Sequence, residues 1–376
     1  MQSSDRPPVE PYSRGIERAG TARASSRALD TNPFPTRRTM KLIYAGSVKN
    51  LVQAENADQL WFEYTDDYSV FDWGKMPNKI PGKGEVLAKL GEFFFKALED
   101  PATWKELGLA EDPLVSRWLP MRHHFLKRQD NKLLVTKVHV PVLKADSVGG
   151  TLVYDYGYPP QPRHLVPLEV IFRFGVPAGS SLLQRKDWYP FDIYEGAEFE
   201  QPLIEFSTKL ETKDRVISYQ EAALILKGNT DTLGEIYGRT RALALFLHKL
   251  FAARGLKLWD GKFEFAMIDG KICVVDSIGP DELRVSRGDA VYSKQFLRNF
   301  YLDSPWYAAL KKAEALAKQR GTENWKAIVK DEMKQEPGPL SKPYLDAATA
   351  LYQDFYAIIA GGKKDSRSFT DALTRL

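Results

Sequence analysis

Residues 256–284 read LKLWDGKFEFAMIDGKICVVDSIGPDELR, and this segment decides how the rest of the chain is interpreted. It predicts two strands joined by a tight turn. Lys262–Ile268 begins with phenylalanines alternating with polar residues, Asp269-Gly270 is a typical turn pair, and Ile272–Val275 is apolar and β-branched. The segment therefore predicts an antiparallel hairpin at the centre of a sheet.

The charges on this hairpin are unusual for a purely structural element. A strand directs Asp260, Lys262 and Glu264 to one face, and Phe263 and Phe265 to the core on the other face. Hard divalent cations prefer carboxylate oxygens, so the hairpin predicts a site for a divalent metal and phosphates. A solvated strand face with scattered charges remains the alternative. The site prediction also includes the charged residues of the return side, Asp276, Asp281 and Arg284.

The register of the hairpin decides whether its carboxylates meet. A two-residue turn at Asp269-Gly270 pairs Glu264 with Val275 and places Asp276 on the opposite face. We therefore predict a three-residue loop that includes Lys271, with the glycine in a left-handed bulge. In that register Glu264 and Asp276 share a metal.

Composition bounds the class of protein. The chain has 376 residues, of which 43% are hydrophobic and 27% charged, which is ordinary globular material. A net charge of +4 is small for this length and does not indicate nucleic-acid binding. The single cysteine, Cys273, cannot form an internal disulfide and fits a reducing cytoplasm. No apolar run approaches the ~20 residues of a membrane-spanning helix.

Four parts are expected along the chain. The first 40 residues are rich in arginine, proline and serine and predict a disordered tail, with a true start at Met40 as the alternative. Segment 141–164 predicts an extended excursion or hairpin of unknown role. The expected parts are a tail (1–40), a small antiparallel nucleotide-phosphate lobe (41–140), a large α+β lobe with the metal and substrate site (141–300) and a helical C-terminal segment (301–376).

Periodicity and capping residues predict the main elements within these parts. His123 and His124 are expected to be structural, and 207–215 to be a polar segment between elements. The predicted strands are 41–44, 60–64, 133–140 and 166–173, and the predicted helices are 85–98, 231–254, 304–319, 323–334 and 343–359.

Three further motifs have side chains suited to anions. The turn Tyr44–Lys49 combines glycine with lysine and could cover nucleotide phosphates. Gly82-Lys83-Gly84 precedes a predicted helix, and a helix N-terminus attracts anions. Arg173 ends an apolar strand close to Gly179-Ser180, a good position for a bidentate phosphate contact. The Tyr44–Lys49 turn alone is a weak signal, and a turn followed by a core helix is the alternative for Gly82-Lys83-Gly84.

Taken in order, the motifs resemble one family, the SAICAR synthetases (phosphoribosylaminoimidazole-succinocarboxamide synthases) of purine biosynthesis. The resemblance runs from about Leu42 to Phe300. It is based on Tyr44–Lys49, Ser69–Asp72, Lys83-Gly84, Pro167–Val170 with Arg173 and Gly179-Ser180, Ser207–Lys209, Asp260–Phe265, Asp276–Arg284, and Lys294-Gln295 with Arg298.

The resemblance implies an ATP-dependent amide ligase with a two-lobed α+β fold similar to protein-kinase and ATP-grasp architectures. Such enzymes join the carboxylate of carboxyaminoimidazole ribotide to the amine of L-aspartate, through an acyl phosphate, using ATP and Mg²⁺. Metal and cations then neutralise the anions that phosphoryl transfer brings together. Small molecules are the implied partners, and a homo-oligomer is left open.

The resemblance also implies roles for individual residues. Gly46, Ser47, Val48 and Lys49 correspond to a loop over the ATP phosphates, and Glu264 and Asp276 to magnesium ligands, with Glu264 also at the nucleotide. Lys209 and Lys262 steady nucleotide or substrate anions, and Arg173, Ser180 and Arg284 hold the ribotide phosphate. Asp214 falls beside the imidazole, and Asp281 positions substrate or metal.

Several positions depart from the family pattern. Ser47 stands where many members have lysine, Ser277 where an acid commonly follows Asp276, and Gly279 where a serine is usual; Asp214 lacks the usual preceding histidine. These departures keep two alternatives open beside a purine-pathway enzyme. One is a paralogue that uses the same chemistry on another carboxylate or amine. The other is a catalytically silent nucleotide-binding protein.

Overall fold

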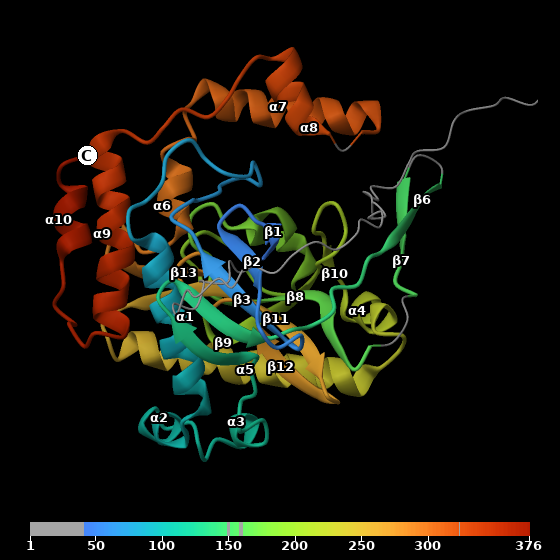
Figure 1. Cartoon of the computed structure of the whole chain (residues 1–376), viewed down its shortest axis with the longest axis vertical. Helices are drawn as coiled ribbons and strands as arrows, with labels where there is room; N and C mark the ends of the chain where they lie inside the picture. The colour runs from blue at the N-terminus through green and yellow to red at the C-terminus, as the bar shows by residue number, and fades with distance from the viewer. Residues whose placement is uncertain (1–40, 149–150, 158–160, 323) are drawn as a thin grey trace, which may run out of the picture. The chain divides into compact units, whose positions relative to one another are not determined.

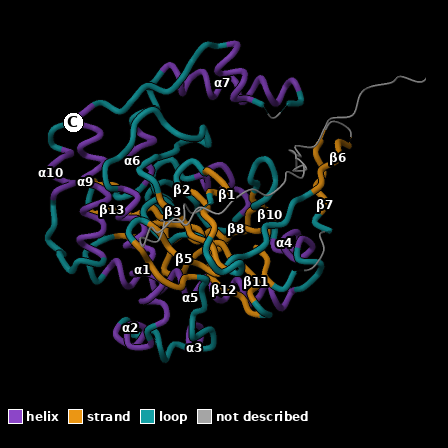
Figure 2. The backbone as a smooth tube through the Cα atoms, in the orientation of Figure 1, coloured by secondary structure: helices purple, strands orange, loops and turns teal. Residues whose placement is uncertain are grey.

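A computed structural model describes residues 41–376 except 149–150, 158–160 and 323 (Figure 1). The predicted tail, residues 1–40, and the alternative start at Met40 lie outside the described residues. Contacts join Met40–Leu376 into one compact unit. Helices surround antiparallel sheets in this unit, which confirms the predicted α+β class (Figure 2).

The first sheet among the described residues has five antiparallel strands in the order β1-β2-β3-β5-β4. Helix α1 (Lys83–Glu99) packs against it, and a Cβ at Gly91 would lie 2.7 Å from Leu133 Cδ1, so the glycine permits the close approach. Strand β5 ends at Thr136, four residues before the predicted end. The bounds are β1 Leu42–Ala45, β2 Lys49–Gln53, β3 Gln59–Tyr64, β4 Phe125–Gln129 and β5 Lys132–Thr136.

The second sheet has the strand order β10-β9-β8-β11-β13-β14, with β12 paired to the other part of β11. The long helix α5 (Thr230–Ala252) packs on β8, β9 and β11, and Gly255 follows it with a positive φ of 70°, a conformation that glycine adopts without strain. The bounds are β8 Arg163–Gly175, β9 Glu198–Thr208, β10 Val216–Ile217, β11 Lys257–Ile268, β12 Lys271–Val275, β13 Leu283–Arg287 and β14 Ala290–Val291.

The remaining elements lie around these sheets. The predicted hairpin in 141–164 is present as β6 (Lys144–Val148) paired with β7 (Thr151–Asp155). At the C-terminus α9 lies beside α1 and α10 (Figure 1). The other helices are α2 Pro101–Glu106, α3 Pro113–Ser116, α4 Tyr219–Ile225, α6 Lys294–Asn299, α7 Pro305–Arg320, α8 Trp325–Ala327, α9 Lys342–Ile359 and α10 Ser368–Leu373, with a 3₁₀ segment at Ser181–Trp188 and a π-helical turn at Ile328–Glu332.

The central hairpin forms with a different turn from the one predicted. Ile268 pairs with Lys271 and Glu264 with Val275, so Asp269-Gly270 is a two-residue turn. Both turn residues have positive φ, 50° and 76°, which is the geometry whose twist matches a hairpin. The predicted three-residue loop is therefore wrong. Phe263 and Phe265 are 2% and 0% exposed, which confirms the predicted core face.

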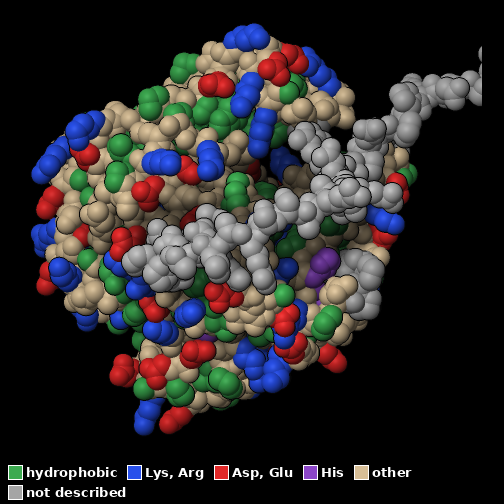
Figure 3. All heavy atoms as spheres, in the orientation of Figure 1, with side chains coloured by type: hydrophobic (Ala, Val, Ile, Leu, Met, Phe, Trp, Pro, Cys, Tyr) green, Lys and Arg blue, Asp and Glu red, His purple; other side chains and the backbone are tan. Residues whose placement is uncertain are grey.

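Other features bear on the predicted organisation. One hydrophobic cluster includes side chains from both sheets and from α1, α5, α7 and α9. The boundaries of the two predicted lobes therefore stay a prediction. Within the described residues no helix is both long and apolar enough to cross a bilayer. Basic and acidic side chains are interspersed on the face shown in Figure 3.

Candidate active site

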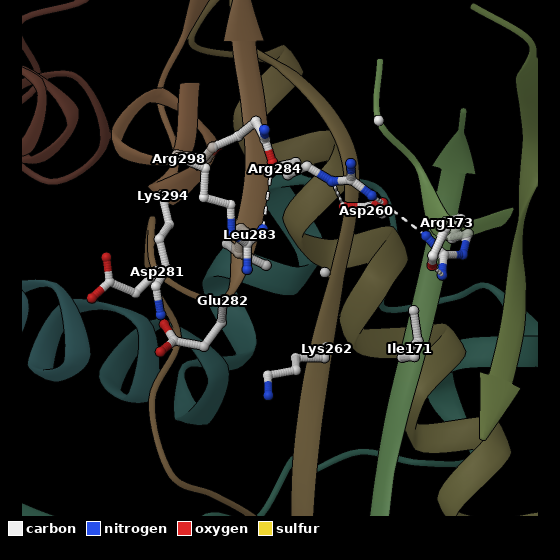
Figure 4. A pocket seen from close by; sticks show the side chains of 15 residues that line it. Ile171, Arg173, Asp260, Lys262, Asp281, Glu282, Leu283, Arg284, Lys294 and Arg298 are labelled. Atoms are coloured by element: carbon white, nitrogen blue, oxygen red, sulfur yellow. Dashed lines mark hydrogen bonds and ion pairs between the residues drawn. The ribbon is translucent and has the colours of Figure 1, made fainter. Parts of the chain in front are cut away.

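A polar cavity of about 270 Å³ opens between β8, β11, the segment before β13, and α6 (Figure 4). Most of the side chains that line it are charged, which is the opposite of an ordinary apolar ligand pocket. The lining residues are Ile171, Arg173, Gly179, Ser181, Asp260, Gly261, Lys262, Asp281, Glu282, Leu283, Arg284, Ser293, Lys294, Gln295 and Arg298.

One wall of this polar cavity is an arginine–aspartate–arginine arrangement. Asp260 pairs directly with Arg173 across β11 and β8, and Arg173 Nη1 donates to Asp260 Oδ2 at 3.0 Å. Arg284 approaches from the other side and donates to both Asp260 oxygens, with Nε 2.7 Å from Oδ1 (Figure 4). Arg173 Nε also donates to Glu205 Oε2 at 2.6 Å. Both guanidinium groups are thus held in fixed positions at the cavity wall.

Ser180 contacts Arg173 of this wall but does not itself line the cavity. Its side chain is buried, its Oγ lies 3.5 Å from Arg173 Nη1, and it accepts from the backbone N–H of Leu182 at 3.4 Å. The cavity is lined by its neighbours Gly179 and Ser181. Ser180 therefore reaches the predicted phosphate site chiefly through Arg173.

Further along β11 lies a cluster of lysines and carboxylates. Glu264 sits directly opposite Glu169 of β8, and two like charges in that position repel each other. Lys209, just after β9, bridges them, with Nζ 2.6 Å from Glu264 Oε1 and 2.8 Å from Glu169 Oε1. Lys262 Nζ lies 2.6 Å from the same Glu169 oxygen. The predicted shared face of Asp260, Lys262 and Glu264 is confirmed.

The environment separates the pKa values of the two glutamates. Burial would raise the pKa of Glu169, but Lys262 and Lys209 outweigh it and lower this pKa. Burial and the nearby charge of Asp276 raise the pKa of Glu264 despite the two lysines. Burial would lower the pKa of Lys209, but Glu264 and Glu169 raise it. The positive charge near Glu264 is therefore too small to offset the burial of its carboxylate and the repulsion from Asp276.

Asp276 joins this cluster through an unusual backbone conformation. Strand β12 ends at Val275, and Asp276 has a φ of 69°, in the left-handed region. The two-residue turn was expected to separate Asp276 from Glu264; the left-handed residue brings them to one cavity instead. Lys49 forms an ion pair with Asp276. Burial opposes the charge of Asp276, but Lys49 lowers its pKa to about 2.

A second cavity of about 250 Å³ has Lys49, Glu264 and Asp276 at its polar end. The rest of its lining is largely apolar and comes from β1–β3, β5, β8 and β12 and from the segments before β4 and after β5. Such a composition suits a flat aromatic ring with a charged tail at the lysine. The other lining residues are Tyr44, Leu51, Leu60, Phe62, His124, Val135, Thr136, Val138, Val140, Leu165 and Val275.

The predicted phosphate loop is the turn between β1 and β2. Gly46 N–H donates to the Lys49 carbonyl at 3.1 Å, and a Cβ at Gly46 would lie 2.3 Å from that oxygen, so glycine is required. Ser47 and Val48 form the rest of the turn. Of the four predicted residues only Lys49 lines the second cavity.

Asp281 and Asp214 are positioned differently. Asp281 lines the polar cavity and lies 2.9 Å from the buried Lys83 ammonium. Burial and the nearby charge of Glu169 raise the pKa of Asp214 to about 6, against the opposing effect of Lys209. A carboxyl group with a pKa near neutrality can exchange protons at physiological pH. Asp214 lines neither of the two cavities described above.

Sequence reasoning assigned no role to several residues of the polar cavity, although the family resemblance included them. Glu282 is partly exposed, but its Oε2 is buried and makes no hydrogen bond within the described residues, and desolvation together with Asp281 raises its pKa to about 8. Arg298 Nε is likewise buried without an acceptor there. Burial lowers the pKa values of Lys294 and Arg298. Buried polar atoms without partners indicate a ligand position, but no sequence motif distinguishes them from surface charges.

His124 was predicted to be structural; it lines the second cavity and contacts Asp276 through the backbone carbonyl of that residue. Its Nε2 lies 3.3 Å from the Asp276 carbonyl, and its ring packs on Phe62 and Phe95. Burial lowers the pKa of His124 to about 3, despite the opposing charge of Asp276. The imidazole is therefore neutral at physiological pH.

The side chains present fit Mg²⁺. Three ammonium groups (Lys49, Lys209, Lys262) face four carboxyl groups (Glu169, Asp214, Glu264, Asp276). Among the described residues, no set of three or more histidine, cysteine or acidic side chains is placed to hold a metal. Magnesium, however, is commonly bound by one or two carboxylates together with substrate phosphates and water. Glu264 and Asp276 meet that requirement.

Comparisons with known proteins agree with this geometry. A sequence model of the SAICAR synthetase family matches residues 42–313. A relative from Archaeoglobus fulgidus, provisionally named a phosphoribosylaminoimidazole-succinocarboxamide synthase, is 32% identical over 337 residues, covering 85% of this chain and 94% of that protein. The Streptomyces coelicolor phosphoribosylaminoimidazole-succinocarboxamide synthase is 26% identical, covering 85% and 93%.

A solved structure shows the same fold. The SAICAR synthase of Saccharomyces cerevisiae, complexed with SAICAR, matches 88% of this chain and 98% of its own, with a TM-score of 0.55 and 22% identity. The fold and the family model together define a ligase of purine biosynthesis. The chain belongs to the SAICAR synthetase family.

Proposed function

We propose that this chain joins carboxyaminoimidazole ribotide to L-aspartate, using ATP, to give SAICAR, ADP and phosphate. One observation carries the proposal: a single ion-pair cluster links the two cavities, with Lys262 in the lining of the polar cavity, Glu264 in the lining of the second cavity, and Glu169 and Lys209 joining them. A nucleotide in the second, largely apolar cavity would place its phosphates at Lys49. A substrate in the polar cavity would present its carboxylate at Lys262.

The polar cavity suits a phosphorylated substrate. Arg173 and Arg284 are fixed by Asp260, and a pre-positioned guanidinium group binds phosphate at low entropic cost. Arg298 from α6 adds an unpaired donor within the described part of the chain. We assign the ribotide phosphate to this end, with Ser180 holding Arg173 in place.

The proposed chemistry has two steps. A carboxylate oxygen of the ribotide attacks the γ-phosphorus of ATP, ADP leaves, and an acyl phosphate forms. The amine of L-aspartate then attacks the acyl carbon, loses a proton, and expels phosphate. Glu264 and Asp276 would hold Mg²⁺, which neutralises charge on the transferring phosphoryl group.

The residues of the chain divide the remaining work. Lys209 and Lys262 are already held against carboxylates and stabilise the anions that approach each other in the first step. Asp214, whose pKa is raised to about 6, is the candidate base for the amine proton. Asp281 contacts the substrate in the polar cavity.

We also propose a reducing compartment, the cytoplasm, for this reaction. Cys273 is the single cysteine of the sequence, and its side chain is buried and free.

The test is ADP release with ATP and Mg²⁺, with ribotide and L-aspartate supplied separately and together. The proposal predicts release that requires both substrates, with a succinocarboxamide product identified by mass. Release with a different carboxylate or amine would instead indicate a paralogue. Tight ATP binding without any turnover would indicate a silent binder.

A further inference from the structure

Helix α9 (Lys342–Ile359) contacts a residue that lines the polar cavity, although it lies beyond residues 42–313, where the family match ends. It packs beside α1, whose first residue is Lys83 (Figure 1). Tyr352 of α9 is 1% exposed, and its hydroxyl donates to Asp281 Oδ1 at 2.5 Å. A residue outside the matched region thus contacts a predicted catalytic carboxylate.

Asp281 has a second partner on its other oxygen. The Lys83 side chain is fully buried, and its Nζ lies 2.9 Å from Asp281 Oδ2. Lys83 Nζ makes no hydrogen bond within the described residues, so this contact is one of charge rather than direction. The tyrosine hydroxyl is therefore the directional contact that sets the rotation of the carboxylate.

The Lys83 ammonium also lies 5.3 Å from the centre of the Tyr352 ring. This cation–π contact depends on the ring and not on the hydroxyl. Replacing tyrosine by phenylalanine consequently removes the hydrogen bond to Asp281 while keeping the ring, its volume and its contact with Lys83.

The surroundings of Asp281 also favour the ionised form of its carboxyl group. Burial would raise its pKa, but Lys83, Lys294 and the hydrogen bond from Tyr352 lower it. Asp281 is thus an ionised carboxylate with a partner on each oxygen, Tyr352 on Oδ1 and Lys83 on Oδ2. Such contacts fix the conformation of a side chain that belongs to the lining of the polar cavity.

We propose that Tyr352 is a positioning residue of the active site: its hydroxyl orients the Asp281 carboxylate in the polar cavity. The C-terminal helix then completes the site rather than merely covering the fold. The inference rests on the proposed function for the ligand that Asp281 meets.

The test compares Tyr352→Phe with Tyr344→Phe. Tyr344 lies on the same helix, and its hydroxyl also donates, to the Phe296 carbonyl at 2.8 Å, but it does not contact Asp281. We expect kcat/KM for the ribotide to fall by about 10–100-fold in Tyr352→Phe, the range for groups that orient an active-site residue. The KM for ATP should not change, and Tyr344→Phe should retain wild-type kinetics.

A double variant separates positioning from general destabilisation. If Tyr352 acts through Asp281, then Tyr352→Phe should add no further loss to Asp281→Asn. The proposal would be overturned if the fold-losses in kcat/KM of the two single variants multiplied in the double variant, or if Tyr344→Phe lost as much activity as Tyr352→Phe. A kcat/KM within twofold of wild type in Tyr352→Phe would also overturn it.

A readout without turnover keeps this inference distinct from the proposed function. Carboxyl-carbon NMR, with the Asp281 resonance assigned by Asp281→Asn, should show a higher Asp281 pKa in Tyr352→Phe and no change in Tyr344→Phe. If the wild type forms no SAICAR, the proposed function fails, and this titration still decides whether Tyr352 controls Asp281. An unchanged pKa would overturn the inference.

Discussion

Replacing Glu264 by glutamine removes one buried negative charge at nearly constant volume, and we expect it to abolish most turnover while leaving the fold intact. Lys209 keeps its contact with Glu169 at 2.8 Å, so no ammonium is left unpaired by the change. The four carboxyl groups of the cluster become three and then match its three ammonium groups.

The expected stability change follows from the pKa of Glu264. Burial and Asp276 raise it above the unfolded value, so the folded state disfavours the charge, and stability from this group falls as pH rises through the folded pKa. Above that pKa the glutamine variant avoids the penalty. Its free energy of unfolding should be equal to that of wild type or higher by about 1 kcal/mol, as for other relieved active-site charges.

The expected loss of activity is much larger. A metal ligand supplies several kcal/mol of transition-state stabilisation, and ~3–4 kcal/mol corresponds to roughly 10²–10³-fold in kcat. Urea unfolding gives the stability, and the coupled ADP assay gives kcat. The control is Glu85→Gln, an exposed acid paired with Lys89, which should change stability by no more than about 0.5 kcal/mol and leave kcat unchanged.

Two results would refute this reasoning. Normal turnover in Glu264→Gln would show that Glu264 is a structural strand residue, as the alternative interpretation of the sequence holds. A loss of more than about 2 kcal/mol in stability would show that its ion pair with Lys209 supports the fold, contrary to the charge balance above.

Three further changes test other parts of the site and fold. Arg284→Met should raise the KM for ribotide by roughly 10–100-fold with kcat little changed, because it removes a charged donor while Asp260 keeps its hydrogen bond from Arg173. Equal KM values in steady-state kinetics would show that Arg284 does not bind the phosphate. His124→Asn should reduce the loss of stability on acidification. In the wild type the imidazole, with its pKa lowered to about 3, stays neutral in the folded state, whereas the unfolded chain binds a proton below pH ~6.5, which costs about 1.4 kcal/mol per pH unit. Equal dependence of the unfolding free energy on pH between ~6.5 and ~4 in the two proteins would contradict this. Gly238→Ala should lower the free energy of unfolding by about 1–3 kcal/mol by overpacking, because its Cβ would lie 2.2 Å from the Trp118 ring; an unchanged urea midpoint would show that the ring moves freely.

Local periodicity was sufficient for the parts of the site built on regular strands. The alternation around Phe263 placed Lys262 and Glu264 on one face because a strand has period two, and the structure has them there. The family resemblance then joined Lys49, Arg173 and Arg284, which separate motifs had already indicated, into one site, because no spacing rule connects them across the chain. Their roles stay predictions, although the structure brings each to a cavity wall.

The errors arose where regularity stops. The three-residue loop was inferred by assuming that the strand continues through Asp276; the structure instead ends β12 at Val275 and turns the chain through a left-handed aspartate. Non-glycine residues adopt that conformation rarely, so composition does not predict it. The end of β9 was taken for the start of a polar segment, because Ser207 and Thr208 are polar although both are buried.

Contacts over long separations were also out of reach. Lys83, Asp281 and Tyr352 come from three distant segments that only the packing of α9 on α1 unites. A buried lysine in a Gly-Lys-Gly turn is indistinguishable, in sequence, from an exposed anion-binding lysine. The same holds for Glu282, whose buried carboxylate oxygen rather than its motif makes it unusual.

The measurement that tests the proposed reaction most directly follows oxygen-18 from the ribotide carboxylate. Labelled ribotide, L-aspartate, ATP and Mg²⁺ are incubated with the enzyme, and the phosphate released is analysed by mass. Because an acyl phosphate forms through a carboxylate oxygen and then loses that oxygen with phosphate, one label per phosphate is predicted, together with labelled SAICAR. Unlabelled phosphate, or phosphate release without SAICAR, would contradict activation of the ribotide carboxylate by ATP in this site.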